Sequence, residues 1–200
     1  MPALDAGRLV WIPDEYPMAR LLAASFGRFD RLELRLCRYM NRSSRRTAVR
    51  QLFSVVSRLG DGAFWYALIA LQVWLNGRYG LLPAVHMLAT GGIGVVGYKI
   101  IKQYAVRERP FVTYSGIHCA CAPLDKYSFP SGHTLHAVSF SLMLTHYVPE
   151  LAPLVVAFTL LVALSRVVLG LHYPTDVAAG AVLGGILGTS SLQIARLLTA

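Results

Sequence analysis

Three short segments of the sequence contain side chains suited to holding and cleaving a phosphate ester. The first segment, KQYAVRERP, contains Lys102 and Arg109, and the second, PSGH, ends at His133. The third segment, SRVVLGLHYPTD, begins with Ser165 and Arg166. Arginine supplies a forked pair of donors and lysine a compact charge, so three such cations suit a dianionic phosphate.

Two further residues add donors for the same anion. Ser131 and Gly132 are expected to begin a helix, whose free backbone N–H groups and positive dipole end attract an anion. Gly132 also allows close approach, because it has no side chain. The predicted phosphate-binding residues are therefore Lys102, Arg109, Ser131, Gly132 and Arg166.

Two histidines and one aspartate supply the reactive groups. His172 and Asp176 are four residues apart, so they share one face if the chain around them is helical. A carboxylate on one ring nitrogen fixes the tautomer and leaves the other nitrogen as a nucleophile. His133, on a different helix, is placed to protonate the leaving oxygen. Together these residues predict phosphate-ester hydrolysis through a phosphohistidine, without a metal.

Long apolar runs must position these groups. No Asp, Glu, Lys or Arg occurs over residues 79–98, 127–149 or 177–195, which are gaps of 20, 23 and 19 residues. A helix of about 20 apolar residues crosses a bilayer. The sequence therefore predicts an all-α integral membrane helical bundle with five to six transmembrane helices. Five of these helices are expected at about 61–77, 81–102, 131–148, 151–170 and 175–197.

Residues 1–60 differ from the apolar remainder of the chain. Nine arginines fall between Arg28 and Arg58, interleaved with apolar side chains, and the net charge of the chain is +9. This pattern predicts a basic amphipathic segment on an anionic membrane surface, with part of residues 1–28 helical and one extra membrane helix left open. Nucleic-acid binding fits poorly beside so much lipid-facing sequence. We expect an interfacial segment over 1–60 and a membrane-embedded core over 61–200.

Five crossings would place the connections on alternate sides of the membrane. The turns at 76–80 and 147–152 then fall on one side with the C-terminus. The basic segment, the 103–130 connection and the break at 166–176 fall on the other side. All three chemical segments begin or end at that second side, so we expect them to form one site there.

Lys-x6-Arg-Pro, Pro-Ser-Gly-His and Ser-Arg-x5-His-x3-Asp occur in this order over residues 102–176. The ordered set resembles the three signature motifs of the type 2 phosphatidic acid phosphatase superfamily, which groups lipid phosphatases with bacterial acid phosphatases and vanadium haloperoxidases. The resemblance implies that His172 is the nucleophile, Asp176 its partner and His133 the general acid. It also implies that the five residues above hold the phosphate, and that no metal or other cofactor is needed. The apolar helices resemble the membrane branch, whose members act on lipid phosphates.

Two signals for the orientation in the membrane oppose each other. The positive-inside tendency, applied to the arginines between residues 28 and 58, places the site in the cytoplasm. The resemblance implies the inner membrane of a bacterium, with the site facing the periplasm or the outside. An extra crossing within 13–30 or 47–60 would reconcile the two, and we expect the outward-facing site.

More than one function is compatible with these residues. The leading hypothesis is a lipid phosphate phosphatase acting on undecaprenyl diphosphate, phosphatidylglycerol phosphate or phosphatidic acid, with a lipid A phosphatase or phosphotransferase as a substrate variant. A membrane anion transporter or channel would also use cations at helix ends, and the same residues could bind vanadate for halide oxidation. The expected partners are the lipid phosphate and the bilayer, without nucleic acid, and no feature indicates an oligomeric state.

The remaining polar residues receive less specific predictions. Asp125 precedes the second segment and is a candidate for contact with the lipid headgroup. Arg107 and Glu108 are expected to form a solvated pair, Asp61 to cap a helix, and His136 to pack or touch the substrate. The three cysteines lack zinc-type spacing and are expected to be free thiols.

Overall fold

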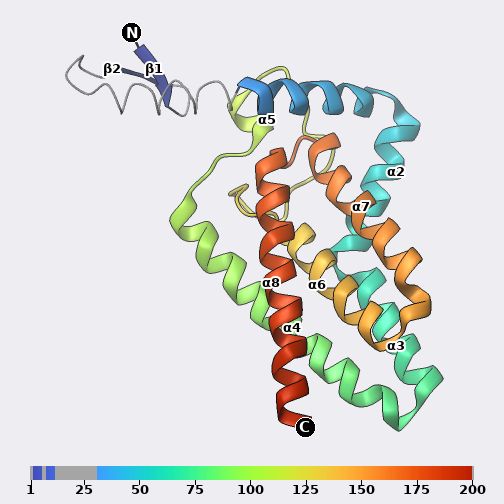
Figure 1. Cartoon of the computed structure of the whole chain (residues 1–200). Helices are drawn as coiled ribbons and strands as arrows, with labels where there is room; N and C mark the ends of the chain where they lie inside the picture. The colour runs from blue at the N-terminus through green and yellow to red at the C-terminus, as the bar shows by residue number, and fades with distance from the viewer. Residues whose placement is uncertain (1, 6–7, 12–30, 200) are drawn as a thin grey trace.

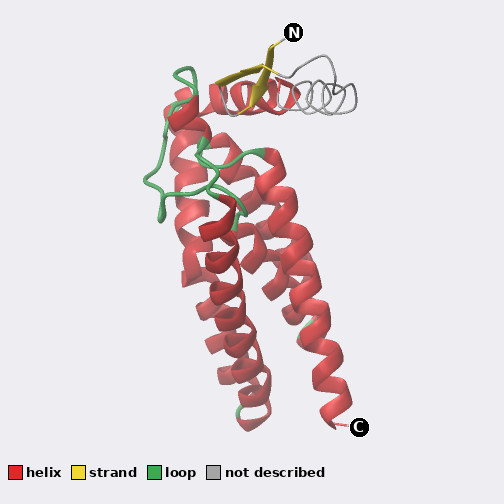
Figure 2. Ribbon diagram, turned by 90° about the vertical axis from the view of Figure 1, so that its left-hand side faces the viewer, coloured by secondary structure: helices red, strands yellow, loops and turns green. Residues whose placement is uncertain are grey.

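The chain folds into a bundle of helices that run roughly along a common direction (Figure 1, Figure 2). The structure, a computed structural model, describes residues 2–5, 8–11 and 31–199. The predicted helical bundle is confirmed. The helix predicted within residues 12–30 lies outside the described residues.

Five helices form the bundle at positions close to those predicted. They are α3 (Phe64–Asn76), α4 (Arg78–Ala105), α6 (Gly132–Tyr147), α7 (Ala152–Val168) and α8 (Pro174–Thr199). The shorter helical elements are residues 31–42, η1 (Ser43–Arg45), α2 (Thr47–Arg58), η2 (Leu59–Ala63), α5 (Pro110–Thr113) and η3 (Pro149–Leu151). Proline occupies one of the first two positions of α5 and α7, where its missing N–H costs no hydrogen bond.

The N-terminal residues form a strand pair. β1 (Pro2–Asp5) and β2 (Arg8–Trp11) are antiparallel, with Pro2 opposite Trp11 and Asp5 opposite Arg8. The sequence indicated helix for only part of residues 1–28, and these eight residues form strands. The sequence RLVW contains valine and tryptophan, which favour strands.

Three described helical stretches are long and apolar enough to cross a membrane. They are Arg78–Thr113, Pro149–Val168 and Pro174–Leu198. Helix α6, with 16 residues, is shorter and lies at the centre, where it packs against α4, α7 and α8. Large apolar side chains on the outer faces of α4, α7 and α8 are exposed, as lipid contact requires. The figure of five to six spans remains a prediction.

Glycines on α8 allow it to lie directly against α6. A Cβ at Gly180 would lie 2.4 Å from the backbone oxygen of Ser131, and a Cβ at Gly184 would lie 2.3 Å from that of Leu135. Side chains larger than hydrogen at these positions would push the two helices apart. This close approach fixes the first turn of α6 beside the first turn of α8, where the Ser131 N–H donates to the Asp176 carbonyl at 3.0 Å.

The N-terminal region joins the bundle through α2, which packs against α7. The path from α2 into α3 passes through the π-helical turn η2, where Gly62 has a φ of 146°. The predicted division between residues 60 and 61 falls inside this turn, and the two-region organisation remains a prediction. Residues 31–42 lie across one end of the bundle, while the C-terminus lies at the other end (Figure 1).

Candidate active site

Three cations from three separate elements meet at the end of the bundle near residues 31–42. Lys102 lies in the last turn of α4, Arg109 directly precedes α5, and Arg166 lies in the last turn of α7. Their exposed fractions are 6%, 2% and 2%. Buried charges of one sign require an anion nearby, because desolvation without a partner is costly. We refer to Lys102, Arg109 and Arg166 as the cation cluster.

The cation cluster lines a cavity of about 120 Å³. Six of the eight predicted site residues line this cavity: Lys102, Arg109, Gly132, His133, Arg166 and His172. The structure therefore brings the three sequence segments together, as their topology predicted. The other two predicted residues, Ser131 and Asp176, are fully buried and do not line the cavity.

Ser131 and Gly132 form the beginning of α6. The Ser131 hydroxyl caps the helix through Thr134, whose backbone N–H and hydroxyl lie 3.5 and 3.0 Å from it. The predicted anion donors at this helix start are backbone N–H groups, whereas the Ser131 hydroxyl serves as the cap. Gly132 faces the cavity, and a Cβ there would lie 3.1 Å from the Tyr98 ring. The role of either residue in phosphate binding remains a prediction.

His172 has its two ring nitrogens in different surroundings. Its Nδ1 lies 3.6 Å from Asp176 Oδ2 and has no hydrogen-bond partner among the described residues. Its Nε2 lies 3.3 Å from a terminal nitrogen of Arg109. The residue lies two positions before α8 begins, so the loop rather than a helical turn aligns it with Asp176.

Burial lowers the pKa of His172 well below its ordinary value, and the positive charges of Arg166, Arg109, Lys102 and His133 lower it further. The imidazole is therefore neutral near pH 7. A neutral ring with Nδ1 toward a carboxylate and Nε2 toward a cation cluster is the form that a nucleophilic histidine requires.

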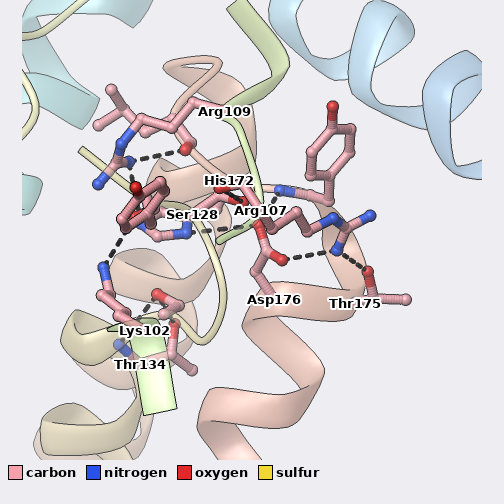
Figure 3. A network of polar contacts seen from close by, with 12 residues as sticks. Lys102, Arg107, Arg109, Ser128, Thr134, His172, Thr175 and Asp176 are labelled. Carbon is pink, nitrogen blue, oxygen red and sulfur yellow. Dashed lines mark hydrogen bonds and ion pairs between the residues drawn. The ribbon is translucent and has the colours of Figure 1, made fainter. Parts of the chain in front are cut away.

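Asp176 is fixed by an ion-pair network that centres on Arg107 (Figure 3). Arg107 donates to Asp176 Oδ1 at 2.6 Å and to Glu33 Oε2 at 2.7 Å. The backbone N–H of Tyr173 donates to Asp176 Oδ2 at 2.8 Å. Glu33 Oε1 in turn accepts hydrogen bonds from the backbone N–H and hydroxyl of Thr175. The network fixes the carboxylate at the first turn of α8.

This network corrects one sequence prediction. Arg107 does not form a solvated pair with Glu108, because its guanidinium bridges Asp176 and Glu33. Glu33, one of two acidic residues in the arginine-rich stretch 28–58, was not singled out from the sequence. The only signal in the sequence is that Glu33 is an isolated acidic residue among arginines, and this does not identify its partner.

Asp125 is the anion that meets the cation cluster. Its Oδ1 accepts from Lys102 Nζ at 2.8 Å and from Arg109 at 2.7 Å, and its Oδ2 accepts from Lys102 at 2.9 Å. Burial raises the pKa of the Asp125 carboxyl, but the hydrogen bond and charge of Lys102, followed by those of Arg109, outweigh it and hold the pKa below its ordinary value. The side chain therefore carries a full negative charge at the mouth of the cavity.

The N-terminal helices supply partners for the two remaining cavity groups. His133 Nε2 contacts Asp61 Oδ1, from the turn η2, and Arg166 donates to the Ser57 hydroxyl, from α2. Asp61 was expected to cap a helix, and it contacts a cavity histidine instead. His136 lies between the carbonyl oxygens of Gly132 and Gly91, at 2.9 and 3.1 Å, which is the packing role expected of it.

Known proteins share this sequence pattern and fold. A family model described as the PAP2 superfamily matches residues 80–199. The chain is 33% identical to the undecaprenyl-diphosphatase BcrC of Bacillus subtilis (strain 168) over 136 residues, which are 66% of this chain and 69% of that protein.

Two solved structures are similar to the whole bundle. The crystal structure of Aquifex aeolicus LpxE has a TM-score of 0.70 and 25% identity, covering 81% of this chain and 95% of that chain. A transmembrane PAP2 type phosphatidylglycerolphosphate phosphatase from Bacillus subtilis has a TM-score of 0.65 and 24% identity, covering 84% of this chain and 86% of that chain. Both support the helical membrane fold described above.

Proposed function

The chain belongs to the PAP2 superfamily, and from this premise we propose that it is a membrane lipid phosphatase that removes a terminal phosphate through a phosphohistidine on His172. One observation carries the proposal. The buried His172 presents one nitrogen to a carboxylate and the other to a cavity lined by the cation cluster and His133.

The proposed reaction has two steps. In the first, His172 Nε2 bonds to phosphorus while the bond from phosphorus to the lipid oxygen breaks, and His133 gives a proton to that oxygen. In the second, a water oxygen bonds to phosphorus, the phosphorus–nitrogen bond breaks, and His133 takes a proton from the water. The same histidine thus acts as acid and then as base.

The surrounding residues have supporting roles in this scheme. The cation cluster stabilises the negative charge that spreads over the phosphoryl oxygens in the transition state. Asp176 keeps the proton of His172 on Nδ1 and stabilises the positive charge that the ring acquires. Asp61, which contacts His133, fixes the direction of the proton donor.

The substrate we propose is a membrane lipid that ends in a phosphate monoester or diphosphate. The cavity wall includes Val95 and Tyr98 of α4, and its rim includes the exposed side chains of Tyr66 and Leu124. An apolar rim beside a cationic interior fits a lipid that brings only its headgroup into the site. Gly132 stands where an aspartate would give Pro-Ser-Asp-His, so the second motif does not narrow the substrate to undecaprenyl diphosphate.

Phosphate release by the purified protein in detergent tests the proposal. The four substrates are undecaprenyl diphosphate, phosphatidylglycerol phosphate, phosphatidic acid and lipid A, each with excess EDTA. We expect release from at least one lipid, unchanged by EDTA, and loss of release in folded His172→Ala. Undiminished release in that variant would overturn the assigned nucleophile, and absence of release from all four lipids would overturn the proposed function.

We also propose that the site faces outward across a bacterial inner membrane. The natural cysteines offer a direct test, because Cys119 is exposed on the connection between α5 and α6, whereas Cys37 is buried. Cys121, on the same connection, is a partly exposed free thiol, so a membrane-impermeant maleimide applied to intact spheroplasts should label the wild type and not the double variant Cys119→Ser/Cys121→Ser. Labelling only after the membrane is permeabilised would place the site in the cytoplasm.

A further inference from the structure

The carboxylate of Asp125 contacts donors that the sequence assigns to phosphate. Its carboxylate contacts two of the three cations in the cluster at 2.7 to 2.9 Å, the distances of charge-assisted hydrogen bonds. Asp125 also lines the same cavity as His133 and His172. A phosphate placed within reach of His172 would compete for the same donors, so the carboxylate and the phosphate cannot both keep them.

The side chain of Asp125 is the partner that can leave. It is 37% exposed, while the side chains of Lys102 and Arg109 are 7% and 2% exposed. The two cations belong to helix ends, and Asp125 belongs to the irregular connection between α5 and α6. The backbone of this residue stays anchored when the side chain turns outward, because Arg109 Nε donates to the Asp125 carbonyl at 3.1 Å.

We propose that Asp125 is a specificity-determining residue, a tethered carboxylate that admits dianionic terminal phosphates to the cation cluster and keeps out monoanionic phosphodiesters. This inference rests on the proposed phosphatase function and explains how the same site selects its class of substrate. Phosphodiester headgroups surround any membrane enzyme, so a site made only of cations would be filled by them.

The selection follows from charge and from tethering. A group attached to the chain acts at a high effective concentration, so a free anion must bind the cations more strongly than the carboxylate does. A terminal phosphate carries a charge of about −1.5 to −2 near pH 7 and offers three acceptor oxygens. A phosphodiester carries one charge and two free oxygens, much like the carboxylate itself, and gains little by replacing it.

The tethered carboxylate of Asp125 also lowers the apparent affinity of the cation cluster for every free anion. A site whose competent state is only partly populated binds with its intrinsic affinity reduced by that populated fraction. Removing the carboxylate therefore strengthens the binding of product as well as substrate. We expect a variant without this carboxylate to saturate at a lower lipid concentration and to be inhibited more strongly by product phosphate. Its kcat should not rise.

The test compares Asp125→Asn with Glu108→Gln, using inorganic phosphate and dimethyl phosphate as probes in EDTA. Both substitutions remove one negative charge on the same side of the bundle. The Glu108 side chain is exposed and makes no ion pair among the described residues, so its variant reports the effect of net charge alone. Anion binding is followed by the shift in melting temperature, which needs no turnover, and by inhibition of lipid hydrolysis.

We expect Asp125→Asn to bind phosphate about tenfold more tightly than the wild type, since one charge-assisted contact to the cluster corresponds to roughly that factor. Dimethyl phosphate should inhibit this variant and leave the wild type and Glu108→Gln unaffected. Unchanged or weaker phosphate binding, or equal sensitivity of all three proteins to dimethyl phosphate, would overturn the proposal.

A second variant and one control keep the outcomes distinct. If Asp125→Asn is unstable without an anion, Asp125→Ala in the presence of phosphate gives the same comparison, and rescue of its melting temperature by phosphate supports displacement. Failure of the wild type to hydrolyse any lipid would overturn the proposed function instead. A wild type that hydrolyses lipid, together with unchanged probe binding in both variants, would overturn only the role of Asp125.

Discussion

Two carboxylates are paired with cations around His172, and they are held in opposite ways. Asp176 is fully buried in the first turn of α8, and its partners are Arg107 and the backbone of Tyr173. Asp125 is partly exposed on an irregular connection, and its partners are Lys102 and Arg109 of the cation cluster. The contrast indicates that Asp176 keeps its contacts throughout the reaction, while the substrate phosphate displaces the Asp125 carboxylate from the cation cluster.

The partners of the two carboxylates differ as much as their burial. Arg107, which holds Asp176, does not line the cavity, and it is itself neutralised by Glu33. Lys102 and Arg109, which hold Asp125, both line the cavity. A substrate phosphate that enters the cavity can therefore compete for the cations of Asp125 and leaves the ion pair of Asp176 intact.

The largest effect expected from this contrast is that of Asp176→Asn. The neutral amide no longer stabilises the charged ring of His172 and no longer selects its tautomer, so kcat should fall on the order of 1000-fold. Steady-state hydrolysis of the best lipid substrate measures this loss. The melting-temperature shift caused by phosphate should persist in this variant. A normal kcat in the variant would contradict the role of Asp176 as the partner of His172.

Arg107→Met should have the next largest effect. It leaves the carboxylates of Asp176 and Glu33 buried without their shared cation, which should lower the free energy of unfolding by about 2 kcal/mol and kcat by about tenfold or more. Thermal melting and kcat are measured together. Arg50→Met, at an exposed position on α2, is the matched control, and equal losses in both variants would contradict a specific role for the network.

The pH profile of the wild type reports the state of His172. Because its pKa is lowered, the ring stays neutral at pH values where an ordinary histidine, with a pKa of about 6.5, takes up a proton. The acid limb of kcat/KM should therefore lie below pH 6.5. The titratable and charged groups that face the ring are Lys102, Arg109, His133, Arg166 and Asp176.

The same shift has a consequence for stability. Below about pH 6.5 the unfolded chain binds a proton at His172 and the folded chain does not, so this residue makes unfolding easier as the pH falls. Melting temperatures recorded across the same pH range separate this effect from the loss of activity. An acid limb at or above pH 6.5 in a protein that stays folded would contradict the neutral, positively surrounded histidine.

The smallest effect concerns the cysteines. All three are free thiols, and burial, followed by the charges of Glu33 and Asp176, raises the pKa of Cys37 to about 12, which keeps it unreactive. Replacing Cys119 and Cys121 by serine should change kcat less than twofold. Loss of activity on reduction of the wild type with dithiothreitol would contradict the absence of a functional disulfide.

The helices and the meeting of three segments at one end could be predicted from the sequence, because charges are confined to the ends of long apolar runs. The pairing partners could not. Asp61 and His133 are 72 residues apart, and Arg107 and Glu33 are 74 residues apart, so their contacts depend on how the turn η2 and residues 31–42 pack onto the bundle. No local pattern in the sequence encodes that packing.

Asp125 shows a different limit of sequence analysis. Its position before the second motif predicted contact with the headgroup, which stays a prediction, and the structure adds that its carboxylate contacts the cations assigned to phosphate. The sequence displays three cations and predicts a phosphate for them. Only the folded chain reveals that one of its own anions, Asp125, reaches the same donors.

The most direct test of the account is to trap the covalent intermediate. Phosphatidic acid labelled with ³²P, or whichever lipid proves the best substrate, is mixed with the protein and quenched within milliseconds in alkali, where phosphohistidine is stable. Label should appear on the wild type, form and decay more slowly on His133→Ala, and be absent from His172→Ala. Label on another residue, or rapid hydrolysis by His172→Ala, would contradict the assignment of His172 as the nucleophile.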